Sequence, residues 1–250
     1  MNFTQPRVTL VAQTQLVITS RKNERGNYDL DYAAEEWLPY DDESAPSSAD
    51  FLLEFGGRGC YEAWSRSNPA TATNADYVKH ILDVGHYSLL GHASASFYVT
   101  GVSRALTHEL VRHRFLVFSQ RSQRFVDESS CNFVCPPLLD DPEHEDLREA
   151  LHREVLLARR AYTQLADALV ERGITRKKAR ETARAVLPEC TETRLLVSGN
   201  IRAWRDFIKL RDAEGVDAEM RNFAQLVLAE LRQHVAPASL QGLGTEESDG

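Results

Sequence analysis

One short stretch most constrains the fold, because its hydrophobic pattern changes from a two-residue period to a helical one. A-S-A-S-F-Y-V-T at 93–100 alternates and ends in β-branched and aromatic residues, which indicates a strand. Gly101 then predicts a turn. From Val102 the apolar residues follow at helical spacing with Ser103 as a suitable N-cap, so we expect a helix over 102–114. A strand that leads directly into a helix favours a chain of the α+β class.

The remaining pattern is dominated by helices. Further strands are predicted at 8–18, at 193–198 and, with a loop, within 123–134. Helices are predicted at 49–66 (with an interruption at G-G-R-G, 56–59), 74–85, 147–172, 175–186, 201–212 and 217–234. We therefore expect an α+β fold, a helix-rich single domain around a modest mixed or antiparallel sheet. This catalytic domain would span 1–237, with a loop-rich segment at 19–48 and a disordered acidic tail at 238–250.

Composition limits the possible partners. The formal net charge of -8 and the pI near 5.5 argue against broad nucleic-acid binding, which needs a basic surface. Arginine nevertheless supplies most of the 29 basic residues, so any anion site is local. Four irregularly spaced cysteines predict neither a disulfide framework nor a metal site. No apolar run approaches the length of a membrane span, and we expect a cytoplasmic protein without a membrane partner.

Four arginines gather in R-H-R-F-L-V-F-S-Q-R-S-Q-R, residues 112–124. In a helix over 102–114, Glu109, Arg112 and His113 would share one face. The apolar residues 115–118 would return the chain to the core, and Gln120, Ser122 and Arg124 would then face one way along a strand. Guanidinium groups and hydroxyls suit a phosphate, and amides or carboxylates suit a heterocycle. The residues alone favour equally a nucleotide pocket and a structural Arg–Glu network.

Several ordered blocks resemble one family. R-H-R-x7-S, here Arg112-His113-Arg114 and Ser122, is similar to the signature of the flavin-dependent thymidylate synthases, and S-Q-R-S-Q-R-F-V at 119–126 continues the match. The resemblance includes G-H-Y-S-L-L-G-H-A (85–93) and F-Y-V-T-G-V-S-R-A-L-T-H-E-L-V (97–111) upstream. Downstream it includes A-R-A-V-L-P (183–188), T-E-T-R (191–194) and G-N-I-R-A-W-R-x-F-I-x-L-R (199–211). It covers most of 50–236.

The resemblance implies a fold, a reaction and a set of site residues. Family members transfer a methylene from methylenetetrahydrofolate to carbon 5 of dUMP and reduce it with a flavin hydride that comes from NADPH. They are homotetramers with active sites shared between subunits, so self-association is expected here. The residues implied to hold dUMP are Glu109, Leu110, Val111, Arg112, Gln120, Arg121, Ser122, Gln123, Arg124, Arg184 and Arg211. Those implied to hold FAD are His86, Ser88, Arg112, His113, Arg114, Gln120, Asn200, Ile201, Arg202 and Asp206.

Arg211 is the residue whose counterpart polarises the uracil. Carbon 5 of uracil is a poor nucleophile, and a fixed guanidinium would stabilise the negative charge that must develop at N3 and O4. Without the resemblance, Arg211 would be read as a helix-end arginine that compensates the helix dipole. Cys190 is the one tempting nucleophile of the type that other thymidylate synthases use, but the resemblance gives it no role, and all four cysteines are interpreted as structural.

The sequence departs from the family pattern at three positions. Gly91 stands where a glutamate is usual, Gly215 where a histidine is usual, and Asp206 where an amide or imidazole is commoner. We hypothesise that Gly91 and Gly215 are coupled losses from one cofactor contact. The alternatives left open are a catalytically weakened relative that binds flavin and nucleotide, and an arginine-rich nucleic-acid-binding protein.

Overall fold

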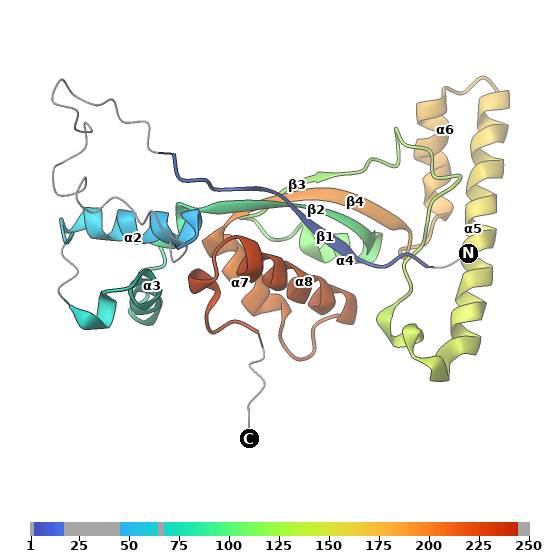
Figure 1. Ribbon diagram of the computed structural model, residues 1–250. Helices are drawn as coiled ribbons and strands as arrows, with labels where there is room; N and C mark the ends of the chain where they lie inside the picture. The colour runs from blue at the N-terminus through green and yellow to red at the C-terminus, as the bar shows by residue number, and fades with distance from the viewer. Residues whose placement is uncertain (1–2, 18–45, 65–67, 245–250) are drawn as a thin grey trace. The chain divides into compact units, whose positions relative to one another are not determined.

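The computed structural model describes residues 3–17, 46–64 and 68–244 (Figure 1). One antiparallel sheet has the strand order β1-β2-β4-β3, formed by β1 (Arg7–Gln13), β2 (Ser94–Ser103), β4 (Glu192–Asn200) and β3 (Val117–Gln120). The helices are α2 (Ser48–Cys60), α3 (Asn74–Asp83), α4 (Arg104–Leu110), α5 (Glu145–Glu171), α6 (Arg176–Ala183), α7 (Ile201–Arg211) and α8 (Ala218–His234). The α+β class with a helix-rich content is confirmed.

The chain divides into two compact units. Unit 1 contains residues 1–9, 97–197 and 211–226, and unit 2 contains residues 10–96, 198–210 and 227–250. Each unit takes segments from several parts of the sequence, so neither corresponds to one continuous stretch of chain. The single domain expected for 1–237 stays a prediction.

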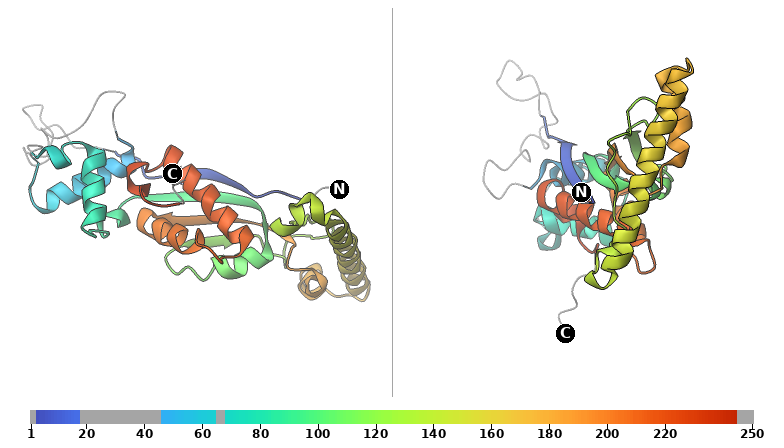
Figure 2. Two further views of the ribbon diagram at one scale, coloured as in Figure 1. Left: turned by 90° about the horizontal axis from the view of Figure 1, so that it is seen from below. Right: turned by 90° about the vertical axis from the view of Figure 1, so that its right-hand side faces the viewer.

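Unit 1 contains the residues around the arginine-rich stretch. Its core includes Phe97, Leu110 and Leu195 together with Met220 and Phe223 of α8, all with side chains at or near zero exposure. Helices α5 and α6 lie side by side in both views (Figures 1 and 2).

The start of α4 is fixed by a side-chain cap. The Ser103 hydroxyl accepts a hydrogen bond from Leu106 N at 3.0 Å and donates to Glu219 Oε2 of α8 at 2.6 Å. The predicted N-cap at Ser103 is therefore confirmed, and it sets where α4 begins.

Unit 2 packs α2 and α3 together with most of α7 and the end of α8. Trp204 and Phe207 of α7 are fully buried and meet edge to face, and the Trp204 indole donates to Ala95 O at 3.2 Å. Ser47 caps α2 by accepting from Asp50 N at 3.1 Å, and Thr73 caps α3.

Two predictions about glycine are wrong. β2 continues through Gly101 instead of turning there, because this glycine adopts φ +70° and a Cβ would stand 1.9 Å from Gln5 O. The G-G-R-G sequence does not interrupt α2. Gly57 instead lets the helix approach Tyr77, whose hydroxyl would lie 2.2 Å from an added Cβ. In both places glycine serves a close approach, not a turn.

Other boundaries also differ from expectation. The helix predicted over 102–114 ends at Leu110. The segment 123–134, where a strand was predicted, forms only isolated bridges at Phe133 and Val134, and the nearest strand is β3 at Val117–Gln120. Thr175 precedes α6 at the predicted position, but its side chain forms no capping hydrogen bond. The last turn before residue 186 is the 3-10 helix η5 (Arg184–Val186). The loop-rich segment predicted at 19–48 falls almost wholly outside the described residues.

The prediction of a disordered tail from residue 238 is wrong for residues 238–244. The 3-10 helix η6 (Ala238–Leu240) is buried, and so is Asp50, which is 1% exposed. The Asp50 carboxylate accepts hydrogen bonds from Ala238 N and Ser239 N, both at 3.0 Å, and from the Ser239 hydroxyl. The small polar composition concealed this contact, because the partner carboxylate lies almost 190 residues earlier in the chain.

Candidate functional site

Arg211 is bracketed by two residues from the end of α4. Its Nε donates to His113 Nε2 at 3.0 Å, and its NH1 donates to Glu109 Oε2 at 2.8 Å. The Arg211 side chain is 19% exposed, so the guanidinium is held at the edge of unit 1 and not in its core. Residues about 100 positions apart thus form one polar cluster in unit 1.

The shared helix face predicted for Glu109, Arg112 and His113 is wrong in its geometry. Because α4 ends at Leu110, residues 111–113 form a turn, in which His113 N donates to Leu110 O at 3.1 Å. Glu109 and His113 still meet, through Arg211, whereas Arg112 is exposed to solvent.

The environment of His113 favours its neutral form. Burial lowers the pKa of His113, and the positive charge of Arg211 lowers that pKa further. A neutral imidazole has one nitrogen that can accept a hydrogen bond, as the contact from Arg211 requires.

The predicted return of residues 115–118 to the core is largely wrong. Leu116 is buried at 5% exposure, but Phe115 is 78% exposed and Val117 is 68% exposed. Beyond them, Phe125 is 62% exposed. The arginine-rich stretch therefore presents apolar side chains on the surface of unit 1.

Gln120 is held by two threonines that the sequence did not single out. Its side-chain nitrogen donates to Thr107 Oγ1 of α4 at 3.0 Å and to Thr193 Oγ1 of β4 at 3.3 Å. A lone threonine in a helix or strand gives no signal of such a role, because the contact exists only after the sheet has formed.

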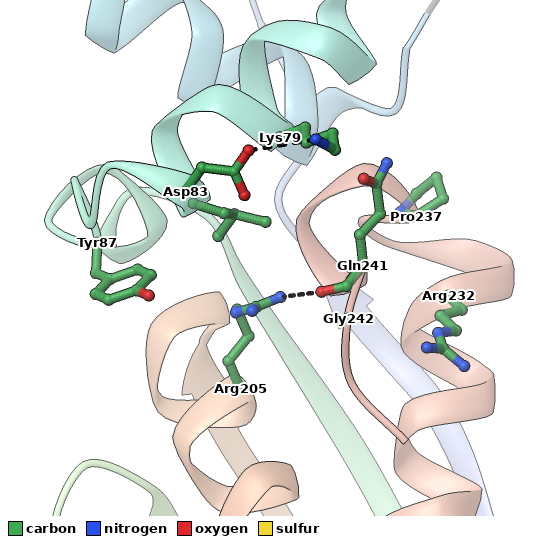
Figure 3. A pocket seen from close by; sticks show the side chains of 9 residues that line it. Lys79, Asp83, Tyr87, Arg205, Arg232, Pro237, Gln241 and Gly242 are labelled. Atoms are coloured by element: carbon green, nitrogen blue, oxygen red, sulfur yellow. Dashed lines mark hydrogen bonds and ion pairs between the residues drawn. The ribbon is translucent and has the colours of Figure 1, made fainter. Parts of the chain in front are cut away.

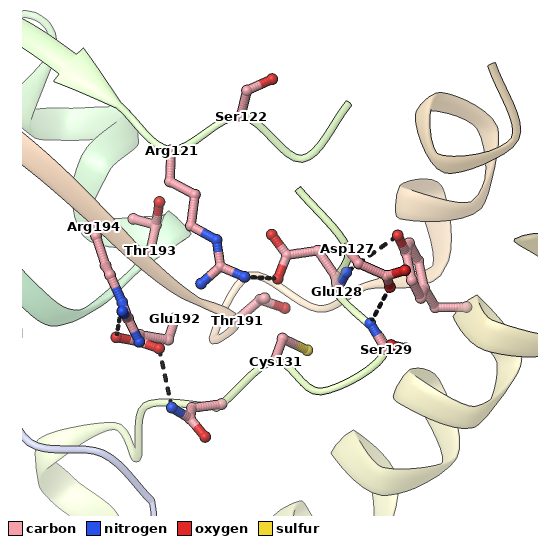
Figure 4. A network of polar contacts seen from close by, with 12 residues as sticks. Arg121, Ser122, Asp127, Glu128, Ser129, Cys131, Thr191, Glu192, Thr193 and Arg194 are labelled. Carbon is pink, nitrogen blue, oxygen red and sulfur yellow. Dashed lines mark hydrogen bonds and ion pairs between the residues drawn. The ribbon is translucent and has the colours of Figure 1, made fainter. Parts of the chain in front are cut away.

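Arg121 is directed into unit 1 by a buried carboxylate. Its NH2 donates to Glu128 Oε2 at 2.8 Å, and Glu128 is 1% exposed (Figure 4). Burial raises the pKa of Glu128, although the charges of Arg121 and Arg104 oppose this shift. Arg121 Nε is buried and donates to no group among the described residues. The acidic residue close after the arginines was the available sequence signal for this pair.

We expected Gln120, Ser122 and Arg124 to face one way along a strand. This reason is wrong, because β3 ends at Gln120 and the other two residues lie beyond it. Figure 4 shows Ser122 directed away from the pair of Arg121 and Glu128. Arg124 forms an exposed ion pair with Glu181 Oε2 at 2.7 Å. The alternative of a structural Arg–Glu network is therefore realised for some of these arginines.

The other residues implied to bind dUMP also lie in unit 1. Leu110 is fully buried in the core, so its side chain cannot reach a ligand, whereas Val111 is 46% exposed. Gln123 is half-buried. Arg184, exposed at the start of η5, lies near Arg104, whose pKa is lowered by burial and also by the charge of Arg184.

The residues implied to bind FAD are found in both units. Arg112, His113, Arg114 and Gln120 belong to unit 1, whereas His86, Ser88, Asn200, Ile201, Arg202 and Asp206 belong to unit 2. Within unit 2, His86, Ser88, Arg202 and Asp206 are exposed, but Ile201 is fully buried and can offer a ligand only its backbone.

Asn200 connects two of the sequence blocks within unit 2. Its side-chain oxygen accepts from Ala203 N at 2.8 Å at the start of α7, and a Cβ added to Gly91 would lie 3.9 Å from its side-chain nitrogen. The segment at 85–93 and the segment at 199–211 are thus adjacent in space.

The sequence of this chain is similar to those of one protein family. Residues 44–238 match the family described as thymidylate synthase complementing protein. Relatives named flavin-dependent thymidylate synthase include those of Mycobacterium marinum (52% identical over 195 residues), Mycobacterium avium strain 104 and Mycobacterium tuberculosis strain H37Rv (each 50% identical over 194 residues). Each alignment covers 75% of this chain and 76% of the relative. The chain belongs to the flavin-dependent thymidylate synthase family.

One departure from the family pattern has a backbone explanation. Gly215 adopts φ +82°, a left-handed conformation that favours glycine whatever the surrounding space. Gly91 has no such requirement and has room for a side chain. The hypothesis of coupled losses is therefore weakened for Gly215, while Gly91 remains a candidate loss near the blocks that the resemblance implies to bind FAD.

Cys131, Cys135 and Cys190 lack the properties of a nucleophile. Burial raises the pKa of Cys131 to about 12 and that of Cys135 to about 11, and it also raises the pKa of Cys190. The thiolate is the reactive form, so these shifts disfavour covalent catalysis by cysteine and suit the flavin-dependent family.

A cavity of about 670 Å³ in unit 2 contains none of the implied site residues (Figure 3). Two of its lining residues fix the C-terminal segment: Arg205 donates to Ser239 O and to Gln241 O at 3.2 Å, and Arg232 donates to Leu240 O at 3.5 Å and to Leu243 O. The two arginines of this cavity thus hold residues 239–243, whereas Lys79 and Asp83 pair with each other at 3.3 Å.

Within residues 3–17, 46–64 and 68–244, no helix combines the length and hydrophobicity needed to cross a bilayer. No group of three or more histidine, cysteine, aspartate or glutamate side chains gathers there as a set of metal ligands.

Proposed function

We propose that this chain is a thymidylate synthase that methylates dUMP to dTMP, with methylenetetrahydrofolate as the carbon donor and with NADPH as the hydride source through FAD. The observation that carries the proposal is the fixed Arg211 between Glu109 and His113 in a chain about half identical to curated flavin-dependent thymidylate synthases. The family name supports the flavin, and the co-substrates are inferred from the resemblance.

Arg211 would act on the pyrimidine. Glu109 and His113 occupy its NH1 and Nε, and NH2 forms no hydrogen bond among the described residues. That group is therefore available to donate to uracil O4. A guanidinium that is already oriented stabilises the negative charge developing there, and the added electron density makes carbon 5 nucleophilic.

Other residues of unit 1 would bind the rest of dUMP. Arginine forks and hydroxyls match phosphate oxygens, and Arg124, Arg184 and Ser122 are the accessible groups of that kind. The pair of Arg124 and Glu181 is an exposed one, so exchanging the carboxylate for a phosphate would lose little. Gln120 and Arg121, held by Thr107, Thr193 and Glu128, would keep the shape of this surface.

FAD would supply the hydride that reduces the transferred methylene. The fit of this chain to the cofactor rests on polar side chains that are exposed in each unit. In unit 2, His86, Ser88 and Arg202 lie on segments that meet at Asn200. In unit 1, Arg112 and Arg114 are exposed. Arginine and serine would donate to the negatively charged diphosphate of FAD.

Self-association as a homotetramer is part of the proposal. Phe115, Val117 and Phe125 are each more than 60% exposed and flank the residues implied to bind dUMP. Large apolar groups exposed close together in sequence favour a surface covered by another copy of the chain. The four cysteines are free, which suits the cytoplasm as the proposed compartment.

The test is rescue of a thymidine-requiring strain. The wild-type chain should restore growth without thymidine, and Arg211→Ala should not, at equal protein abundance. Arg148→Ala is a matched control. The Arg148 side chain is 40% exposed, and its ion pair with Glu145 on α5 is a long one of 3.7 Å. Failure of the wild-type chain to rescue, although it binds flavin, would favour a catalytically weakened relative. A colourless protein that binds nucleic acid would contradict the proposal altogether.

A further inference from the structure

The contact between Arg211 and His113 specifies one form of the imidazole. Arg211 Nε carries a single hydrogen and can only donate, so His113 Nε2, at 3.0 Å, must present its lone pair. The imidazole is then neutral with its proton on Nδ1. A protonated ring would carry a hydrogen on both nitrogens and could not accept this bond.

We propose that neutral His113 is a positioning residue for Arg211, and that protonation of His113 releases Arg211 from the orientation needed to polarise the uracil. The structural part stands on the contacts alone, whereas the link to uracil rests on the proposed function.

Two contacts are needed to fix the guanidinium. Glu109 holds NH1 at 2.8 Å, but a single bond would let the planar group pivot about that point. The second bond, from Nε to His113, removes this freedom and sets where NH2 is directed. Loss of the His113 contact would leave Arg211 bound to Glu109 in a range of orientations.

The surrounding charges determine the direction of the pH effect. Arg211, from α7, contacts His113 directly, and Glu109, from α4, reaches it through Arg211. Burial and the Arg211 charge lower the pKa of His113 below its ordinary value of 6.5. The contact should therefore be present at neutral pH and be lost as the pH falls through this lowered value.

The structural part is tested by histidine nitrogen NMR on the purified protein without substrates. The resonances of His113 should show a neutral Nδ1-protonated ring at pH 7, and Arg211→Met should raise the pKa of His113 because the neighbouring charge is removed. A ring with its proton on Nε2, or a pKa unchanged by Arg211→Met, would overturn the proposal.

The functional part is tested by dUMP affinity, measured calorimetrically at constant saturating FAD from about pH 8 to about pH 5.5. The phosphate of dUMP also titrates, with a pKa of about 6, so the informative quantity is the difference between variants. In His113→Gln the amide oxygen can accept from Arg211 and does not titrate. Wild-type affinity should fall more across this range than that of His113→Gln, by at most about tenfold at pH 5.5, because a single site whose pKa lies below 6.5 cannot cost more than this by binding one proton.

His108→Gln is the matched control, since His108 also lies at the end of α4 but is 70% exposed and pairs with Glu189 at 3.4 Å. It should follow the wild-type pH profile. Equal falls in wild type and His113→Gln would overturn the proposed gating. If the wild-type protein binds no dUMP at any pH, the proposed function fails, and the NMR result still decides whether His113 positions Arg211. If His113→Gln does not fold, the decision likewise rests on the NMR comparison.

Discussion

Replacing Asp50 should release the C-terminal segment of unit 2. This carboxylate is 1% exposed and accepts from Ala238 N, Ser239 N and the Ser239 hydroxyl, while its own backbone N–H donates to Ser47. In Asp50→Ala, three donors in a buried environment would lose their acceptor. The substitution therefore isolates one contact that joins the two ends of unit 2.

The size of the effect follows from the contacts. Each buried donor left without a partner destabilises by about 1–2 kcal/mol, which gives about 3–6 kcal/mol for three. Removing the carboxylate also recovers the free energy spent on burying a charge, which offsets part of this loss. We expect the free energy of unfolding to fall by about 2–4 kcal/mol in Asp50→Ala, and by about half as much in Asp50→Asn, which keeps one acceptor oxygen.

Urea unfolding and amide hydrogen exchange measure the two consequences separately. Asp50→Ala should lower the unfolding midpoint and speed exchange at Ala238 and Ser239. Asp83→Ala is the control, because Asp83 is exposed on α3 and pairs only with Lys79 in a 3.3 Å contact. A stability within about 0.5 kcal/mol of wild type, with exchange unchanged at both amides, would refute the reasoning.

The pH dependence of this effect has a defined sign. Burial raises the pKa of Asp50 above its ordinary value of 3.8, against the opposing effect of its hydrogen bonds. The folded state then holds the proton more tightly than the unfolded state, so the contribution of Asp50 is largest below 3.8 and declines as the pH rises through the raised value. Because Asp50→Asn does not titrate, the stability difference between it and the wild type should shrink over the same range.

Three further substitutions or treatments test other parts of the molecule. Ser103→Ala should lower the free energy of unfolding by about 1–2 kcal/mol through loss of the α4 cap, whereas Ser103→Thr should lower it less. Equal urea midpoints for the wild type and both variants would contradict this. Gly91→Glu should bind FAD several-fold more tightly in a flavin fluorescence titration, since the position has room for a side chain, and an unchanged affinity would rule out a lost contact there. An alkylating reagent should modify exposed Cys60 in the folded protein. Cys131 and Cys135, whose pKa values burial raises to about 12 and about 11, should react only in denaturant, and equal alkylation rates of the three thiols in the folded protein would contradict this.

The fold was predictable where the sequence contains local signals. Alternation at 93–100 predicted β2, and apolar periodicity with the Ser103 cap predicted the start of α4. Thr175 marked the start of α6, although its side chain forms no capping hydrogen bond. The errors came from contacts distant in sequence. Gly101 has the composition of a turn, but its conformation is set by the close approach of Gln5, and no local rule anticipates that.

The candidate site was predictable only in part. The resemblance identified Glu109, His113 and Arg211, but it did not show that they bond to one another. Thr107 lies within the block 97–111 but was assigned no role, and Glu128 lies outside the quoted blocks. Their contacts with Gln120 and Arg121 depend on packing of α4, β4 and the loop after β3. Local pattern indicates which side chains suit a nucleotide, and tertiary packing decides which of them are held in place.

The decisive measurement is dTMP formation from dUMP by the purified protein, quantified by mass spectrometry with FAD, NADPH and methylenetetrahydrofolate present. We expect dTMP formation to depend on all four compounds and to be about 10²–10³-fold slower in Arg211→Ala, the range typical for loss of one group that stabilises developing charge. Oxidation of NADPH without any dTMP, or an Arg211→Ala variant as fast as wild type, would contradict it.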